Sequence, residues 1–496
     1  MNTPIRKIGI IQTSPQPGDF SNNLRAIVQG YRDCLDHGAE LVITSIYALT
    51  GPEPMDLKRR KSFLEQQEEA AMTLAAELHS TDVPLITGFC LETDLSDNPE
   101  DDDYWQADDG LLYDEKEEAY SRVEHVMMAP CLIHRGNVHP LIAGSNSTIG
   151  NLLCHITLSS EEELPEVMPD LIIHMPTQPW HNLAHEKEKE VFCWEAMNTE
   201  VPVVCVHSVG TVNGNLYGGG SAIYLSSGLA GRLPYFEPAT ITMRLTRPSS
   251  PLTSPDMLRM VEKALIQGIR DTVRQNGYYG ICVPLDFRNS SLLTWLCIKA
   301  LGASNVSGYS FCGNEYKGIT CHKADADTLV QQAAELLSLE DRTALTQRIR
   351  GALLSSFCEE KGLMLLCPLD QHSLMMGEFT LYGESCGYLA PFGNLYRSDI
   401  FMLSKYISEQ DPDMVHSIPE PTKPEQDRLI HDLMERNVSA GDILRVERGI
   451  FEENEVRLVQ RKTTASALKR TQLPIILRFT APDEQMQFPV SHRLND

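Results

Sequence analysis

The sequence contains no apolar segment that approaches the roughly 20 residues a membrane-spanning helix requires. Its first residues, MNTPIRKIGII, also lack the pattern of a secretory signal peptide. CxxC pairs are absent, although the chain has 13 cysteines. Without an export signal these cysteines are expected to be reduced thiols. Together these absences predict a cytoplasmic protein that does not span a membrane.

Positive charge is scarce. Lys and Arg number 42 against 68 Asp and Glu, which gives a formal net charge of −26 and a pI near 5.0. Nucleic acids and anionic lipid surfaces attract basic patches, so this balance argues against either as the main partner. Hydrophobic residues make up 42% and charged residues 22%, as in an ordinary globular protein.

The length of 496 residues favours two domains, because a single hydrophobic core rarely grows beyond about 250–300 residues. The first half alternates short β-rich runs with apolar residues at helical spacing, and it contains one strongly acidic stretch, residues 94–118, expected to form a solvated loop and hairpin. Helices are expected around residues 24–35 and 64–78. Strands are expected at Ile8–Ile11, Glu40–Ile43, Val83–Phe89, Gly150–Cys154, Leu171–His174, Val203–Val206 and Ala222–Leu225.

Residues 247–256 have the composition of a linker between a domain 1–246 and a domain 257–496. The stretch TRPSSPLTSPD is dense in Pro and Ser and has no hydrophobic period. Ser254 is expected to cap the next helix, with Pro255 at its first position.

The second half opens with the β-loop-α-β order of a parallel, doubly wound sheet, whose ligands bind at the carboxyl ends of the strands. The predicted elements are a helix Met257–Asn276, a strand Gly280–Leu285, a helix Leu292–Leu301 and a strand Val306–Ser310. The segment from Ser310 to Thr346 is expected to be too short for a further strand.

Short sequence matches run in order along nearly the whole chain. They include VITSIYALTGPEPMDL at 42–57, IGNLLC at 149–154, PTQPWHNLAHEKE, YGGGSAIYLSSG, TQRIRGALL and FTLYGESCGYLAPFGNLYRSDIF. By their order and spacing the chain resembles the glutamine-dependent NAD⁺ synthetases, which join a nitrilase-type glutaminase to an ATP-dependent synthetase. The resemblance implies an α/β fold with an N-terminal nitrilase-like α-β-β-α sandwich and a C-terminal doubly wound parallel sheet of the adenine nucleotide alpha hydrolase type.

The resemblance also places the residues of the amidase half. Nitrilase-type catalysis uses a Cys nucleophile, a Glu that moves protons and a Lys that holds the oxyanion. Cys154 matches the nucleophile, whereas Ile46 stands at the Glu position and Arg122 or Val123 at the Lys position. Ile46 can accept no proton, and His155 should point to the opposite face of the strand from Cys154. We therefore expect an inactive amidase half, with residual thiol chemistry at Cys154 as the alternative.

The synthetase half departs from the family in the same way. GICVPLDFRNSSLL at 280–293 lies where the family keeps its SGGxDS phosphate loop, and the loop positions read Asp286, Phe287, Arg288, Asn289, Ser290 and Ser291. Large side chains at glycine positions are expected to fill the space that phosphate needs, although Arg288 could bind an anion as a side chain. PLDQHS at 368–373 replaces the family's TGNKSE. The persisting Arg348, Arg350 and Tyr382 are predicted to lie near a dinucleotide, with ordinary helix charges as the alternative for the two arginines.

No metal site is predicted. His181 and His185 have the i,i+4 spacing that can bring two ligands onto one helix face, but no carboxylate completes a HExxH motif. Gly218, Gly219 and Gly220 precede Ser221 in a run that resembles a phosphate loop, yet it matches a family turn that leads into a strand.

Three functional hypotheses follow. The first is a non-catalytic relative of NAD⁺ synthetase that requires no cofactor and acts as a structural or regulatory subunit, as a homo-oligomer or with an active paralogue. The second is a divergent but active glutamine-dependent NAD⁺ synthetase that uses ATP and Mg²⁺ to convert nicotinate adenine dinucleotide to NAD⁺. The third is a sensor that binds a dinucleotide without chemistry.

Overall fold

The computed structural model describes residues 6–54, 56–92, 125–159, 164–182, 189–246, 256–411 and 423–480. The chain divides into two compact units. Unit 1 comprises Met1–Pro179, His185–Gly210 and Tyr217–Ser254, and unit 2 comprises Trp180–Ala184, Thr211–Leu216 and Pro255–Asp496. Two short segments of the N-terminal half therefore belong to the second unit. The predicted linker, the acidic stretch 94–118 and His185 lie outside the described residues, apart from Asp256 at the end of the linker.

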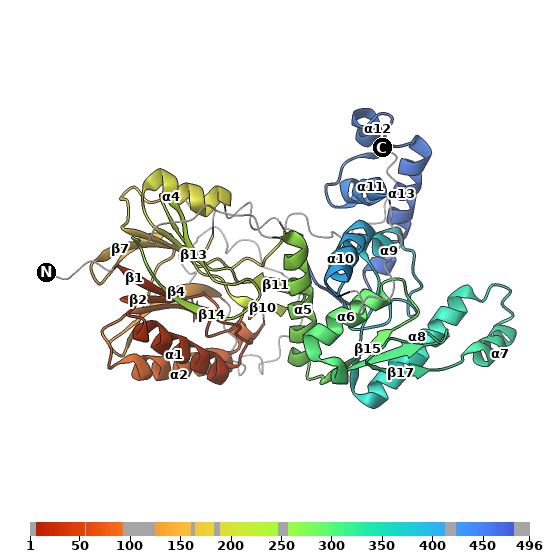
Figure 1. Ribbon diagram of the computed structural model, residues 1–496, viewed down its shortest axis with the longest axis horizontal. Coiled ribbons are helices and arrows are strands. Elements are labelled where there is room, and N and C mark those ends of the chain that lie inside the picture. The colour runs from red at the N-terminus through yellow and green to blue at the C-terminus, as the bar shows by residue number, and fades with distance from the viewer. Residues whose placement is uncertain are drawn as a thin grey trace, which may run out of the picture. The chain divides into compact units, whose positions relative to one another are not determined.

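Unit 1 is built on two six-stranded sheets (Figure 1). The first has the order β14-β1-β2-β3-β4-β5 and the second β13-β12-β9-β8-β7-β6. The strands of the first are β1(Lys7–Gln12), β2(Leu41–Thr44), β3(Leu85–Glu92), β4(Val126–His134), β5(Asn137–Pro140) and β14(Ala239–Arg244). Those of the second are β6(Ser145–Ile149), β7(Leu152–Thr157), β8(Leu171–His174), β9(Val203–Cys205), β12(Ala222–Leu225) and β13(Gly228–Arg232).

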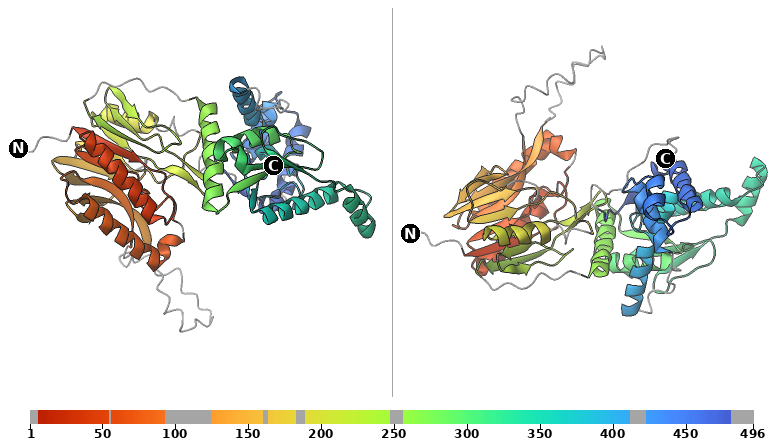
Figure 2. Two further views of the ribbon diagram at one scale, coloured as in Figure 1. Left: turned by 60° about the horizontal axis from the view of Figure 1, so that its bottom comes forward. Right: turned by 90° about the horizontal axis from the view of Figure 1, so that it is seen from above.

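Helices cover the outer faces of both sheets. Helices α1(Phe20–Asp36) and α2(Lys61–Leu78) lie side by side on the first sheet, and α4(Trp194–Thr199) packs on the second (Figures 1 and 2). Asp19 caps α1 by accepting a hydrogen bond from Asn22 N, and the helix buries Ile27 and Tyr31 against the sheet. The facing sides of the two sheets share one apolar cluster. This arrangement confirms the predicted α-β-β-α sandwich.

Unit 2 contains a four-stranded parallel sheet in the order β17-β16-β15-β18. Helix α6 packs on β15 and β16, and α5 packs against α6. Helix α8 packs over the other face through Leu354 and Cys358, which contact Cys282 and Tyr309 of the sheet. The strands are β15(Gly280–Pro284), β16(Val306–Ser310), β17(Thr320–Lys323) and β18(Leu363–Leu365), and the first helices are α5(Met257–Gln275), α6(Ser290–Leu301), α7(Asp327–Leu337) and α8(Thr343–Lys361). The doubly wound architecture is therefore confirmed.

The rest of unit 2 is largely helical, and Figure 2 shows it from two further sides. Its elements are α9(Gln371–Met376), α10(Arg397–Gln410), α11(Pro424–Met434), α12(Ala440–Val446), α13(Glu453–Ala465), α14(Ala467–Arg470) and the short parallel pair β19(Leu389–Ala390) and β20(Ile475–Ile476). A separate hairpin is formed by β10(Val209–Val212) and β11(Asn215–Gly218). None of the described helices has the length and apolarity needed to cross a membrane.

Two local predictions were wrong. The segment between Ser310 and Thr346 does hold a strand, β17, which pairs with β16 at the sheet edge. Asp256, rather than Ser254, caps α5, because its carboxylate accepts hydrogen bonds from Leu258 N and Arg259 N at 3.1 and 3.4 Å.

Candidate functional site

The position of the missing amidase acid is packed as core. Ile46 follows β2 and is fully buried. Its main chain lies so close to β3 that a Cβ at Gly88 would come within 2.0 Å of Ile46 O, so residue 88 must be glycine for this contact. The Ile46 side chain belongs to the apolar cluster between the sheets, and Cys154 belongs to the same cluster.

The thiol of Cys154 lies on β7 and is fully buried. Burial, reinforced by the charge of Asp170, raises the pKa of Cys154 to about 12. Its Sγ donates to Leu152 O at 4.0 Å, and no carboxylate of the described residues bonds to the sulfur. Such a thiol is protonated at neutral pH, and a protonated thiol is a poor nucleophile.

The other groups that might assist Cys154 are engaged elsewhere. Glu40 accepts hydrogen bonds from Arg6 N and Lys7 N at 2.5 and 3.0 Å, and Glu53 accepts one from Tyr217 Oη at 2.7 Å. His155 Nδ1 lies 3.1 Å from Oδ1 of Asn146, on the neighbouring strand, while Cys154 faces the inter-sheet cluster. The predicted separation of His155 from Cys154 is confirmed. Arg122 and Val123 lie outside the described residues.

In unit 2, polar groups of the loop between β15 and α6 are hydrogen-bonded within the protein. The Asp286 carboxylate accepts hydrogen bonds from Ser310 Oγ at 2.5 Å, from Phe311 N at 2.6 Å and from Asn314 Nδ2 at 3.0 Å, which ties the loop to the end of β16. Ser290 Oγ donates to Pro284 O and accepts from Phe287 N, at 2.6 and 3.2 Å. A phosphate cradle needs backbone N–H groups that point toward a ligand, and this loop uses at least one of its own internally.

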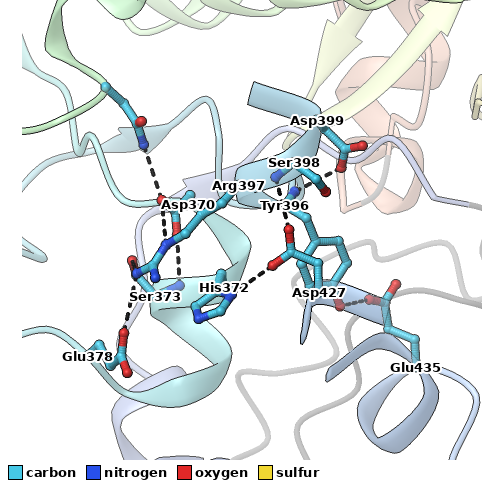
Figure 3. A network of polar contacts seen from close by, with 11 residues as sticks. Asp370, His372, Ser373, Glu378, Tyr396, Arg397, Ser398, Asp399, Asp427 and Glu435 are labelled. Atoms are coloured by element: carbon cyan, nitrogen blue, oxygen red, sulfur yellow. Dashed lines mark hydrogen bonds and ion pairs between the residues drawn. The ribbon is translucent and has the colours of Figure 1, made fainter. Parts of the chain in front are cut away.

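The second strand end forms a network of buried polar contacts (Figure 3). Asp370 caps α9 by accepting from Ser373 N at 2.8 Å, and it also accepts from Asn289 Nδ2 at 3.2 Å. His372 Nδ1 lies 2.7 Å from Oδ1 of Asp427, and Gln371 Nε2 donates to Glu435 at 2.8 Å. The positions where the family has Lys and Glu in TGNKSE are thus occupied by side chains that bond within the protein.

Arg397 completes this network at the start of α10 (Figure 3). Its Nε lies 3.5 Å from Oδ2 of Asp370, and its Nη2 donates to Ser373 Oγ at 3.0 Å and to Glu378 at 3.3 Å. Glu378 in turn accepts from Lys462 Nζ at 3.0 Å. The charges at this strand end are therefore paired with one another, and the set does not fit a magnesium–triphosphate group.

A pocket remains beside this network, at the carboxyl ends of β15 and β16. Its polar lining includes Asp286, Gln347, Arg350 and Glu384, and its apolar lining includes Phe287, Tyr309, Phe311 and Leu354. The Arg350 guanidinium lies 5.4 Å from the centre of the Phe311 ring, and its buried Nε has no hydrogen-bond partner. A flat aromatic wall beside an incompletely bonded guanidinium suits a planar, anionic ligand.

The structure separates the residues predicted for the dinucleotide, and also those predicted for the phosphate loop. Arg350 and Phe287 line the pocket, whereas Arg288 is exposed and is not among the lining residues. Arg348 Nε donates to Leu381 O at 3.3 Å, and Tyr382 is 62% exposed with its Oη donating to Gln472. Sequence reasoning missed Tyr309, Phe311, Cys312 and Cys386 of the lining, although the first three lie at the end of a correctly predicted strand.

The remaining motifs carry no site. Gly219 and Gly220 adopt positive φ values of 64° and 75° in the turn that leads into β12, which confirms the interpretation as a turn. A Cβ at Gly220 would lie 2.2 Å from the Tyr235 ring. Within the described ranges no group of three or more His, Cys, Asp or Glu side chains is arranged to hold a metal ion.

Comparison with known proteins shows the relationship in sequence. The family model for NAD synthase matches residues 322–423. The glutamine-dependent NAD(+) synthetase of Synechocystis sp. is 23% identical over 455 residues, covering 81% of each chain. That of Acinetobacter baylyi is 22% identical over 520 residues and covers 94% of each.

Solved structures show the same fold. The glutamine-dependent NAD⁺ synthetase of Acinetobacter baumannii, in complex with adenosine diphosphate, matches with a TM-score of 0.68 at 17% identity, over 99% of this chain and 100% of that one. The enzyme from Cytophaga hutchinsonii matches with a TM-score of 0.78 at 12% identity, over 98% and 97%. The predicted resemblance to glutamine-dependent NAD⁺ synthetases is confirmed along both halves of the chain.

Proposed function

Since this chain belongs with the glutamine-dependent NAD⁺ synthetases in sequence and fold, we propose that it is an NAD⁺ synthetase-like protein that binds an adenine nucleotide or dinucleotide without transferring amide nitrogen. It then acts as a regulatory or structural subunit or as a dinucleotide sensor. The proposal combines two observations. The pocket lined by Arg350 is present, and other residues stand at the catalytic positions of the family.

One observation carries the loss of glutaminase activity: Cys154 and Ile46 are packed in one apolar cluster. A glutamine amide would have to reach a buried, protonated sulfur with no acid beside it. Loss of a general acid–base alone lowers rates by about 10²–10⁴-fold. The raised thiol pKa lowers the nucleophile concentration further.

The binding half of the proposal rests on Arg350 and its surroundings. Phe311 and Tyr309 offer aromatic surface to an adenine or nicotinoyl ring, and the guanidinium of Arg350, which also lines the pocket, offers a positive charge to a phosphate. The Asp286 carboxylate is already hydrogen-bonded to Ser310 and Phe311, so the pocket favours recognition of the nucleoside and one phosphate over a metal-bound triphosphate.

Calorimetry tests the proposed binding of a nucleotide, and a turnover assay tests the proposed loss of amide transfer. The full-length protein is titrated with ADP, NAD⁺ and nicotinate adenine dinucleotide, alongside Arg350→Ala and, as a matched control, Arg348→Ala. We expect Arg350→Ala to weaken binding at least about tenfold, and Arg348→Ala to have a smaller effect. Absence of binding by all three ligands contradicts the sensor function.

The comparisons favour a second candidate, an active glutamine-dependent NAD⁺ synthetase, because full-length relatives carry that name. It predicts NAD⁺ formation from nicotinate adenine dinucleotide, ATP, Mg²⁺ and glutamine, and alkylation of Cys154 by a glutamine-like electrophile. Turnover within about 10²-fold of a working synthetase, abolished by Cys154→Ala with glutamine but not with ammonia, establishes this candidate and rejects the first.

Association with a second subunit is also part of the proposal. A regulatory subunit needs a partner, either another copy of this chain or an active paralogue. Light scattering on the purified protein, alone and mixed with an active synthetase, measures both possibilities. A monomer in both samples contradicts a subunit role and leaves the sensor function.

A further inference from the structure

The longest run of basic residues in the sequence lies at the start of α2. The run reads Lys58, Arg59, Arg60 and Lys61, in a chain whose net charge is −26. Three of these side chains are exposed, and Lys58 is partly buried. We call these four residues the basic patch. It is a local concentration of positive charge on the surface of an acidic protein.

The basic patch is neutralised only in part by neighbouring side chains. Arg60 pairs with Asp56 at 2.7 Å. Lys61 pairs with Glu65 at 3.9 Å. The other two residues of the patch have no ion pair with a carboxylate of the described residues. The first turn of α2 also carries no acidic residue, so the positive end of the helix dipole adds to these charges. The patch therefore retains positive charge that an acidic group could neutralise.

The acidic stretch, residues 94–118, is inserted between two paired strands of the first sheet. It has 12 Asp and Glu against a single Lys. Strand β3 ends at Glu92 and strand β4 begins at Val126, and these two residues pair with each other in the antiparallel register. The chain therefore leaves the sheet and returns to it at one place.

That place lies beside the start of α2. Helix α2 connects the parallel strands β2 and β3, so it runs antiparallel to both, and its first turns lie near the carboxyl end of β3. Gln67 Nε2 donates to Cys90 O at 2.8 Å, and Cys90 N donates to Gln67 Oε1 at 2.7 Å. Burial raises the pKa of Cys90 to about 11, and the charge of Lys58 acts in the opposite direction, so Lys58 lies near the same part of β3.

We propose that the basic patch binds the chain's own acidic stretch, residues 94–118, through ion pairs at the surface of unit 1. The opposite charges of the two segments favour this occupant over a neutral or basic partner. Both ends of the insertion are fixed beside the patch, so its carboxylates are present at a high effective concentration that a separate acidic partner lacks. The patch shares no residue with the Arg350 pocket, so this contact is independent of nucleotide binding there.

Carbodiimide cross-linking of the full-length wild-type protein tests the contact, because the reagent joins amines to carboxylates that touch them. We expect peptide mass spectrometry to find amide bonds from Lys58 or Lys61 to carboxylates of residues 94–118. Their yield should fall at least about fivefold between about 0.1 and 1 M NaCl, since the Debye length shrinks from about 10 Å to about 3 Å. Lys462 and Glu378, 3.0 Å apart in unit 2, provide an internal standard for the reagent.

A charge reversal in the basic patch provides a second test. The double variant Lys58→Glu, Arg59→Glu should release the acidic stretch. We expect amide hydrogen exchange in residues 94–118, followed by mass spectrometry, to become at least about threefold faster. The matched control, Lys361→Glu with Lys405→Glu, changes the net charge equally at exposed lysines of unit 2 and should leave this exchange unchanged.

Three outcomes overturn the proposal. One is the absence of cross-links from the patch to residues 94–118 while the cross-link between Lys462 and Glu378 forms. Another is a cross-link yield that rises with protein concentration, which would mean that the acidic stretch of a second copy occupies the patch. The third is equal hydrogen exchange in the patch variant and in its control, which would mean that the patch does not hold the stretch.

Discussion

Asn289 donates a hydrogen bond from Nδ2 to Oδ2 of Asp370 at 3.2 Å, and both side chains are buried. The bond joins the loop before α6 to the start of α9, the two segments that correspond to the nucleotide-contacting motifs of the resemblance. The two replaced motifs therefore stabilise each other. Their substitutions form one bonded network with Arg397 and Glu378, rather than a set of unrelated losses.

The Asp370 network should be important for the stability of unit 2. Asp370→Ala removes the cap of α9 and leaves Arg397, which is largely buried, with one partner fewer. We expect the free energy of unfolding to fall by about 2–4 kcal/mol, measured by urea denaturation. The exposed cap Asp256→Ala is the matched control and should cost about 1 kcal/mol. Equal losses in the two variants would show that the network adds nothing beyond capping.

Cys154 should be unreactive in the folded protein, whereas the exposed Cys312 should react. With a pKa of about 12, the Cys154 thiolate is a minute fraction at pH 7.5, and the sulfur is buried. We expect iodoacetamide to label Cys154 at least about 100-fold more slowly than Cys312, as followed by peptide mass spectrometry. Unfolding in urea should bring the rates close together. Comparable rates in the native protein would reveal an accessible, activated thiol.

The doubly wound sheet was predicted from hydrophobic periodicity and the order of the elements, whereas the α-β-β-α sandwich was implied by the resemblance to a known family. Strands such as β8 and β16 were predicted with the bounds that the structure gives them. Strand β17 was missed because TCHK has little apolar content and lies at a sheet edge, exposed in part. The burial of Arg470 was not predicted, because the burial of a charged side chain depends on tertiary packing that no local pattern encodes.

The space beside Cys154 should not accept an acid at position 46. Ile46→Glu buries an unpaired carboxylate in the apolar cluster, and we expect a loss of more than about 3 kcal/mol in the free energy of unfolding. Ile46→Val, the matched control, should cost only about 0.5–1.5 kcal/mol. If Ile46→Glu were as stable as Ile46→Val, a solvated cavity would have to exist beside Cys154, and that result would support the active synthetase.

Asp271 of α5 gives a pH-dependent prediction. Its side chain is 8% exposed, its Oδ2 has no hydrogen-bond partner, and burial raises its pKa to about 6. Arg270, Arg274 and Thr211 act in the opposite direction but do not cancel the effect of burial. The folded protein therefore holds this proton more tightly than the unfolded chain, whose Asp pKa is about 3.9.

A carboxyl group whose pKa is higher in the folded protein than in the unfolded chain stabilises the fold at acidic pH, where it is protonated. That stabilisation is lost as the pH rises and the proton dissociates. The contribution of Asp271 should therefore fall between about pH 4 and pH 6 and stay level above that range. Asp271→Asn removes this penalty, so its free energy of unfolding at pH 7 should exceed that of the wild type by about 1–3 kcal/mol. At pH 4 the two should be nearly equal. Urea denaturation from pH 4 to pH 8 measures the difference, with the exposed Glu360→Gln of α8 as control. A difference that does not change with pH would mean that Asp271 is ionised at the usual pKa, paired with a cation.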